Sequence, residues 1–348
     1  MGDNLSTMRP TLDLHRRPLR NLRLSVTDRC NLRCGYCMPE ERYAWLQRSE
    51  LLTFEEASDL VAALTPAGLR KVRLTGGEPL LRRDLDQLVR RLAGVPGLDD
   101  LALTTNGTRL TDLAAGLREA GLHRLTVSLD TLDPARFREL TRRDELEATL
   151  RGLDAAAAAG FEGTKLNVVV MRGVNDDELV AMLDFARERA LEVRFIEYMD
   201  VGGATRWDMS RVGPAGEILE RVGRARGGVT PEDLERTAAP ADRYRTADGQ
   251  RFGVIASTTR PFCGTCDRAR LTADGQFITC LYARTGTPVT PLLRSEGPTA
   301  AAREIVRLWE GRTDRGAEER AALDDRGALA GPGELEDEPH LEMHTRGG

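Results

Sequence analysis

The chain has 348 residues, of which 41% are hydrophobic and 30% charged, and its formal net charge is −5. This length allows a large buried core, and the slight acidity gives no reason to expect a nucleic-acid partner. No apolar run approaches the length of a membrane span, and the first residues lack the apolar region of a signal peptide. Gly2 followed by Ser6 fits only a loose myristoylation pattern, which we discount. We expect a cytoplasmic protein with no membrane partner and reduced thiols.

Short β-like runs and helical stretches alternate between about residues 20 and 200. The predicted strands are residues 22–26, 71–75, 101–105, 124–130, 165–170 and 193–199. The first predicted helix follows Thr53, with Glu56 three residues later as in a capping box. Further helices are predicted near residues 83–94, 112–121, 145–159 and 176–190. Such alternation is typical of parallel strands with crossover helices, and six units favour an incomplete (β/α) barrel, with an open sheet as the alternative.

The two faces of the predicted strands differ in chemistry, because alternate residues of a strand point to opposite faces. One face is apolar and suits the covering helices. The other carries five cations, which are Arg23, Lys71, Arg73, Lys165 and Arg194. Since unpaired charges are too costly to bury in a dry lumen, we predict a wet lumen that holds a polyanion. The alternative is the solvated face of an open sheet.

The alternation fades beyond about residue 205, where we place a domain boundary. A helix is predicted at residues 214–223, and β-like segments follow at 251–257 and 268–280. An amphipathic helix is predicted at residues 301–311. We therefore expect a first domain over residues 1–210, a second over 211–310 and a mobile tail over 311–348, since residues 311–340 contain few large apolar side chains.

The six cysteines fall into two groups of three. The first group is spaced Cys-x3-Cys-x2-Cys and consists of Cys30, Cys34 and Cys37. The second is spaced Cys-x2-Cys-x13-Cys and consists of Cys263, Cys266 and Cys280. One four-thiol zinc site would leave two thiols over, and clustering disfavours six merely structural cysteines. Thiolates hold iron–sulfur clusters, and a four-iron cluster with three protein ligands keeps one iron open for a small molecule, as catalytic metal sites do.

Several motifs make these groups specific. "CNLRCGYC" (30–37), with an aromatic residue before its third cysteine, resembles the signature of radical S-adenosylmethionine (SAM) enzymes. "TGGEP" (75–79) ends the second predicted strand, where that superfamily places its GGEP motif, and its glycines are expected to let the backbone approach the amino group of the ligand closely. With "LTTNGT", "VSLDTLDP", "KLNVVV", "VRFIEYMDVG" and "CGTCDRARLTADG", the chain resembles the GTP 3′,8-cyclase family of molybdenum-cofactor synthesis (MoaA) from about residue 13 to 285 and again at its last residues. The second cysteine group separates this family from many other radical SAM enzymes.

The resemblance implies both a fold and a reaction. The fold would be an incomplete (β/α)6 barrel of the radical SAM type, closed by a mostly β C-terminal extension. The cofactors would be two 4Fe-4S clusters and SAM, and a 5′-deoxyadenosyl radical would convert GTP to 3′,8-cyclo-7,8-dihydro-GTP. The resemblance also implies an external one-electron reductant, a homodimer, and transfer of the product to cyclic pyranopterin monophosphate synthase.

The family's functional residues carry over position by position. The first cysteine group would hold the N-terminal cluster and the second group an auxiliary cluster. The SAM site would contain Tyr36, Gly76, Gly77, Glu78, Ser128 and Met199. The family's GTP contacts fall on Arg23, Arg73, Thr104, Lys165, Arg268, Ala269 and Arg270, to which the strand pattern adds Lys71 and Arg194. Gly347 and Gly348 would reach into the active site, although Arg346 stands where the family commonly carries an aliphatic residue.

Two other functions stay open on the sequence alone. A peptide-modifying radical SAM enzyme with an auxiliary cluster would share the fold, but it would lack a cationic lumen and usually needs more C-terminal cysteines. A non-enzymatic iron–sulfur redox sensor would need neither GGEP nor a barrel, and the chain has no recognisable DNA-reading motif.

Overall fold

Six parallel strands form the middle of one sheet in the computed structural model, which describes residues 10–40, 42–232 and 238–347. The strands are β1 (Asn21–Ser25), β2 (Lys71–Thr75), β3 (Asp100–Thr105), β4 (Arg124–Ser128), β5 (Lys165–Val170) and β6 (Glu192–Glu197). They pair in sequence order, as predicted, and their bounds lie within two residues of the predicted ones. Gly2, Ser6 and Gly348 lie outside the described residues.

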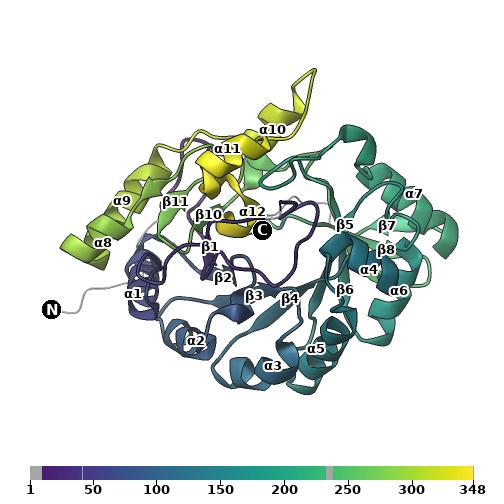
Figure 1. The fold of residues 1–348 in the computed structure, drawn as a ribbon, viewed down its shortest axis with the longest axis horizontal. Coiled ribbons are helices and arrows are strands. Elements are labelled where there is room, and N and C mark those ends of the chain that lie inside the picture. Colours follow the sequence, from purple (N-terminus) through teal and green to yellow (C-terminus); the bar gives the residue numbers. More distant parts are fainter. Residues whose placement is uncertain (1–9, 41, 233–237, 348) are drawn as a thin grey trace.

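Helices surround the strands as an outer ring (Figure 1). Those between or after the parallel strands are α1 (Phe54–Leu64), α2 (Leu85–Ala93), α3 (Leu110–Glu119), α4 (Pro134–Thr141), α5 (Leu146–Ala158), α6 (Leu179–Glu188) and α7 (Ala215–Arg226). The capping box of α1 is confirmed, because the Thr53 hydroxyl accepts from the Glu56 amide and the Glu56 carboxylate accepts from the Thr53 amide. The apolar pattern missed α4, a short helix that Asp133 caps and Pro134 begins.

The extension adds strands to both edges of the sheet. Its strands are β7 (Val229–Pro231), β8 (Asp242–Thr246), β9 (Arg251–Ile255), β10 (Arg268–Leu271), β11 (Gln276–Ile278) and β12 (Thr287–Pro288). Within the described residues the strand order is β12-β11-β10-β1-β2-β3-β4-β5-β6-β9-β8-β7. The prediction that the extension closes the barrel is therefore wrong. β9 pairs with β6 and β10 pairs with β1, both in parallel. Beyond β9 the sheet continues with antiparallel β8 and β7, and beyond β10 it continues with antiparallel β11 and β12. β7 and β12 are therefore the edge strands.

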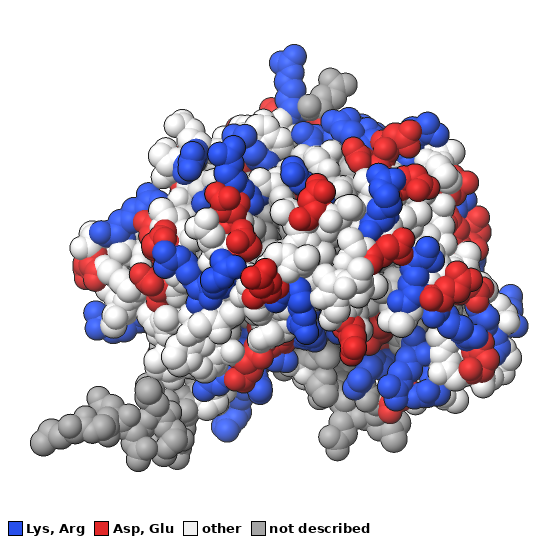
Figure 2. Space-filling model, turned by 90° about the horizontal axis from the view of Figure 1, so that it is seen from below, with Lys and Arg blue, Asp and Glu red and all other residues white. Residues whose placement is uncertain are grey.

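The two faces of the sheet divide as the strand pattern predicted. Leu22, Leu24, Val72 and Leu74 are at most 1% exposed and belong to the core beneath the helices. On the outer surface of the molecule that Figure 2 shows, by contrast, basic and acidic residues are interspersed. The cations of the inner strand face are thus not an extension of a basic outer surface in that view.

Residues 290–347 form a further series of helices. They are α8 (Thr290–Glu296), α9 (Pro298–Glu310), α10 (Gly316–Ala321), α11 (Pro332–Asp337) and α12 (Met343–Arg346). Of these, α9 packs against α1 in the outer layer. Figure 1 places α12 and the C-terminal end over the middle of the ring of strands. The mobility that the composition predicts for residues 311–340 stays a prediction. None of the helices that the structure describes is long and apolar enough to cross a membrane.

Candidate active site

The first cysteine group lies in the loop after β1 and lines a cavity of about 220 Å³. The six residues predicted for SAM line the same cavity: Tyr36, Gly76, Gly77, Glu78, Ser128 and Met199. They come from four different segments, so only the folded chain brings them together with the thiols of Cys30, Cys34 and Cys37.

The glycines after β2 hold the segment that leads into the first cysteine. The Gly77 amide donates to the Thr27 carbonyl at 2.9 Å, and the Glu78 amide donates to the Arg29 carbonyl at 2.7 Å. A Cβ atom on Gly76 would lie 2.2 Å from the Thr27 oxygen, and one on Gly77 would lie 2.4 Å from the Arg29 oxygen. The close approach that these glycines allow is therefore to the chain just before Cys30.

The buried carboxyl groups of Glu78 and Asp130 line this cavity, and Glu197 lines it as well. The Glu78 carboxylate accepts from the Leu80 amide at 2.9 Å and from the Thr105 hydroxyl and the Asn106 amide at 2.7 Å each, and burial raises its pKa to about 7. The Asp130 carboxylate accepts from the Tyr36 hydroxyl at 2.6 Å, and burial raises its pKa to about 6. A cationic ligand would offset the cost of burying these groups in ionised form. Asp130 was not among the predicted site residues, although it lies on the polar face of its predicted strand.

Burial also governs the thiols of the first group. It raises the pKa of Cys30 to about 11, with Glu78 adding to the effect. It raises the pKa of Cys34 and of Cys37 as well. All three cysteines are free of disulfides.

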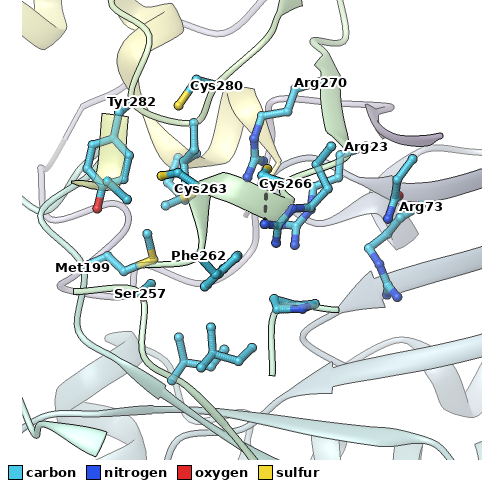
Figure 3. Close-up of a pocket in the computed structure, with 18 of the residues that line it drawn as sticks. Arg23, Arg73, Met199, Ser257, Phe262, Cys263, Cys266, Arg270, Cys280 and Tyr282 are labelled. Carbon is cyan, nitrogen blue, oxygen red and sulfur yellow. Dashed lines mark hydrogen bonds between the residues drawn. The ribbon is translucent and has the colours of Figure 1, made fainter. Parts of the chain in front are cut away.

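The second cysteine group lines a separate cavity of about 240 Å³. Cys263 begins the 3-10 turn Cys263–Thr265 before β10, and Cys280 follows β11. Six of the residues predicted for GTP line this cavity, namely Arg23, Arg73, Thr104, Arg194, Arg268 and Arg270. Figure 3 shows the cysteines at one end, with Arg23, Arg73 and Arg270 on one side and Met199 on the other.

The arginines of this cavity repel one another and are deeply buried. Burial, followed by the neighbouring Arg270, Arg268 and Arg73, holds the pKa of Arg23 well below its usual value. Burial lowers the pKa of Arg270 to about 9 and that of Arg73 to about 10. Such crowding is relieved by a ligand that brings several negative charges.

Three residues predicted for GTP lie outside the lining of both cavities in the described part of the chain. The Lys71 ammonium lies 4.0 Å from the Asp100 carboxylate, and its side chain is 42% exposed. Lys165 lies close to Arg194, which lines the second cavity. Burial and then the charge of Arg194 lower the pKa of Lys165 to about 8. Ala269 is fully buried between Arg268 and Arg270 in β10, so its side chain points to the opposite face.

The end of the described chain reaches this cavity. The Gly347 carbonyl accepts hydrogen bonds from Arg270 and, at 3.4 Å, from Arg23. Gly347 has a φ of +72°, and a Cβ atom there would lie 2.2 Å from the Thr75 methyl group. The Arg346 side chain is buried and donates to the Leu281 carbonyl at 2.7 Å. An arginine at this position therefore fastens the tail to the segment after Cys280.

The two cavities adjoin one another. Their linings share Thr104, Asn167, Ile196, Met199 and Met343. Asn167 and Ile196 were not predicted as site residues, although Asn167 lies on the polar face of its predicted strand. Ligands in the two cavities would meet at these shared residues.

The donor sets fit two iron–sulfur clusters. Among the described residues, no three His, Cys, Asp or Glu side chains converge tightly enough to hold a single metal ion. A cluster spreads its ligands over several irons, and each cavity offers three free thiols, the soft donors that such clusters use. Three thiols in each of two cavities do not fit one four-thiol zinc site.

Comparisons with known proteins agree with this arrangement. Residues 24–186 match the Radical SAM superfamily, and residues 191–317 match Molybdenum Cofactor Synthesis C. GTP 3′,8-cyclase 1 of Mycobacterium tuberculosis (strain ATCC 25618 / H37Rv) is 50% identical over 341 residues, which cover 97% of this chain and 95% of the relative. GTP 3′,8-cyclase of Acidothermus cellulolyticus is 49% identical over 327 residues, which cover 91% of this chain and 90% of the relative.

Among solved structures, Streptococcus suis SuiB bound to S-adenosylmethionine resembles this chain with a TM-score of 0.62. The match covers 88% of this chain and 69% of SuiB. At 15% identity, this likeness concerns the fold alone. Because this chain is 50% and 49% identical to the Mycobacterium tuberculosis and Acidothermus cellulolyticus relatives over 97% and 91% of its length, it belongs to the GTP 3′,8-cyclase family of the radical SAM superfamily.

Proposed function

We propose that this protein is a GTP 3′,8-cyclase that converts GTP to (8S)-3′,8-cyclo-7,8-dihydroguanosine 5′-triphosphate, the first step of molybdenum-cofactor biosynthesis. One observation carries the proposal. Two three-thiol cavities, one flanked by carboxyls and one lined by arginines, meet at shared residues that include Thr104 and Met199. This reaction needs a cationic SAM and a polyanionic GTP side by side.

The first cavity is the proposed SAM site. Cys30, Cys34 and Cys37 would hold a 4Fe-4S cluster, which when bound supplies the one-electron chemistry that releases a 5′-deoxyadenosyl radical from SAM. Tyr36, Gly76, Gly77, Glu78, Ser128 and Met199 would surround SAM. Glu78 and Asp130 would favour its positive charges, and their hydrogen bonds to neighbouring loops would keep the site in shape.

The second cavity is the proposed GTP site. Cys263, Cys266 and Cys280 would hold the auxiliary 4Fe-4S cluster. Arg23, Arg73, Arg268 and Arg270 would bind the triphosphate, because a planar guanidinium meets phosphate oxygens bidentately. Thr104 already accepts a hydrogen bond from Arg73 at 3.1 Å and would orient it. Further contacts are proposed for Lys165 and Arg194, for Lys71 at a longer range, and for Ala269 through its backbone.

The chain's own contribution is to place the ribose of GTP near the shared residues and to exclude water. Gly347 and Gly348 would complete the site, since the Gly347 carbonyl already lies against Arg23 and Arg270. We extend the proposal to domains over residues 1–210 and 211–310, with a mobile tail over 311–348, and to a partial (β/α)6 barrel. We also include a cytoplasmic location, a homodimer, an external one-electron reductant, and transfer of the product to cyclic pyranopterin monophosphate synthase.

Anaerobic reconstitution followed by incubation with SAM and a reductant tests the function. We expect 5′-deoxyadenosine release that depends on GTP and yields the cyclised nucleotide. Release that is indifferent to GTP or depends on a peptide would favour a peptide-modifying enzyme. No release from a protein that has taken up iron would favour a redox sensor.

A further inference from the structure

A buried ion network lies behind the second cysteine group and joins the first described residues to the segment at the end of α9. The Arg17 guanidinium donates to the Asp13 carboxylate at 2.5 Å, and the side chains are 2% and 0% exposed. The Arg312 guanidinium lies 3.7 Å from the same carboxylate and donates to Asp314 at 3.1 Å. Trp309 completes the network, since its indole donates to the Arg17 carbonyl at 3.0 Å and its ring lies 4.4 Å from the Arg312 guanidinium carbon.

Both arginines of this network hold the backbone of the cysteine turn. Arg17 donates to the Cys263 carbonyl at 3.0 Å, and Arg312 donates to the Cys266 carbonyl at 2.9 Å. From the cavity side, Arg268 donates to the Cys266 sulfur at 3.3 Å. Cys266 is therefore held from both sides by guanidinium groups, and Cys263 is held by Arg17.

The charges of this network do not balance. Arg17, Arg312 and Arg268 carry three positive charges, and Asp13 and Asp314 carry two negative ones, so the network itself adds one net positive charge. Outside the network, Glu318 and Asp267 bring negative charge close to this segment, and Arg23 and Arg270 bring positive charge. Buried ion pairs seldom add stability over apolar side chains of the same size. A buried network that contacts two cysteine carbonyls and one sulfur is therefore better explained by an effect on what those cysteines hold.

We propose that Arg17 and Arg312 are positioning residues of the auxiliary cluster, which fix the Cys263–Cys266 turn and raise the cluster's reduction potential. The inference rests on the proposed function. One-electron reduction adds a negative charge to the cluster, and nearby positive charge stabilises the reduced form. Net charge and hydrogen bonds to the sulfurs are known determinants of cluster potentials, and residues behind the ligands tune bound metals.

The test uses the full chain with Cys30, Cys34 and Cys37 replaced by Ala, so that only the auxiliary cluster is titrated. Its midpoint potential is measured by a redox titration followed by electron paramagnetic resonance. Arg312→Met should shift the potential to a more negative value, because it removes the charge and keeps an unbranched apolar stem. Arg312→Lys should stay close to the parent, because it keeps the charge. The matched control is Arg307→Met, at an arginine of α9, the helix that ends just before Arg312, whose side chain is 68% exposed.

Equal potentials in the parent and in Arg312→Met would overturn the inference, as would an equal shift in Arg307→Met. If Arg312→Met fails to fold, Asp314→Asn serves in its place, and it should shift the potential to a more positive value. An unchanged potential in that variant would also overturn the inference. A parent that takes up no iron would instead contradict the proposed function, so the two failures are distinguishable.

Discussion

The two cysteine groups have the same three donors and opposite surroundings. Around the first group, burial raises the pKa of every thiol, and the charged residues that line the cavity are acidic, Glu78 and Asp130 among them. In the second group burial likewise raises the pKa of Cys263, and that of Cys280 to about 11. Only at Cys266 do Arg268 and Arg312 outweigh burial and lower the pKa to about 7. From this difference we infer that the charges around the thiols, rather than the thiols themselves, select the ligand that each cavity binds.

This contrast also acts against misplaced ligands. A sulfonium in the second cavity would face several arginines, and a triphosphate in the first would face the carboxyls of Glu78, Asp130 and Glu197. Like charges held together cost free energy, so each cavity discriminates by repulsion as well as by attraction. Substitutions in the two cavities, or in the tail that lies against them, should disturb this division of charge.

Removing one thiol from each group should give the largest effects and should separate the two roles. Cys34→Ala should abolish SAM cleavage, because the cluster that supplies the electron is lost. Cys266→Ala should leave some cleavage but no cyclised product. The parent should contain about eight irons per chain after anaerobic reconstitution, and each variant about four. Stoichiometric zinc without iron uptake would contradict the whole interpretation.

The tail links the two regions, and disturbing it should suppress the product without emptying either cluster site. Gly347→Ala would place a methyl group 2.2 Å from a Thr75 carbon at a φ of +72°, so the tail must leave its position. Deletion of Gly347 and Gly348 should act in the same way. Product formation, iron content and thermal unfolding are measured together. The matched control is Gly333→Ala, where a Cβ atom meets nothing within 4 Å. Unchanged GTP turnover in both tail variants would show that the tail is dispensable.

Truncating the cations should weaken GTP binding far more than SAM binding. Arg73→Ala and Lys165→Ala each remove a charge-assisted contact worth about 1.5–3 kcal/mol. Arg73 should lie at the upper end, because it lines the cavity and donates to both Thr104 and Thr126 at 3.1 Å. The control is Arg90→Ala, at an arginine of α2 whose side chain is 59% exposed and lies near Asp86, so it should matter little. Binding titrations with both ligands decide, and equal losses for GTP and SAM would indicate misfolding instead.

The sequence predicted the strands and one face of the sheet well, because alternation within a strand is a local property. Parity placed Arg23, Arg73 and Arg194 on the face that lines the second cavity. The alternation of side chains does not show how deeply a residue lies along its strand. It therefore did not distinguish these three arginines from Lys71, which is the first residue of β2.

What the sequence could not give depends on contacts between distant segments. Tyr36 and Asp130 meet across 94 positions, and Arg17 reaches the carbonyl of Cys263 across 246. The pairing of β9 and β10 with opposite edges of the sheet likewise depends on where the extension lies in space. No local pattern indicates these partners.

The smallest predicted effect concerns pH and the tail's outer contact. His340 lies 2.8 Å from the Asp274 carboxylate, which raises the pKa of the imidazole. Burial alone would raise the pKa of Asp274, but the bond to His340 helps to lower it. The His340 contribution is complete below its ordinary pKa of about 6.5 and is lost as pH rises through the raised value, whereas that of Asp274 is lost only in acid.

Docking of the tail should therefore be tightest between about pH 4 and 6.5 and should weaken above that range. The expected change is below about 1 kcal/mol, because the imidazole is partly exposed and its charge is screened. Hydrogen exchange of residues 339–347, corrected for the intrinsic rate, should show less protection at high pH. His340→Gln should remove this dependence while leaving the contacts of Arg346 and Gly347 in place. If the variant keeps the parent's pH profile, the pair of His340 and Asp274 does not control how the tail docks. Docking would then depend on the contacts with Arg270 and Leu281.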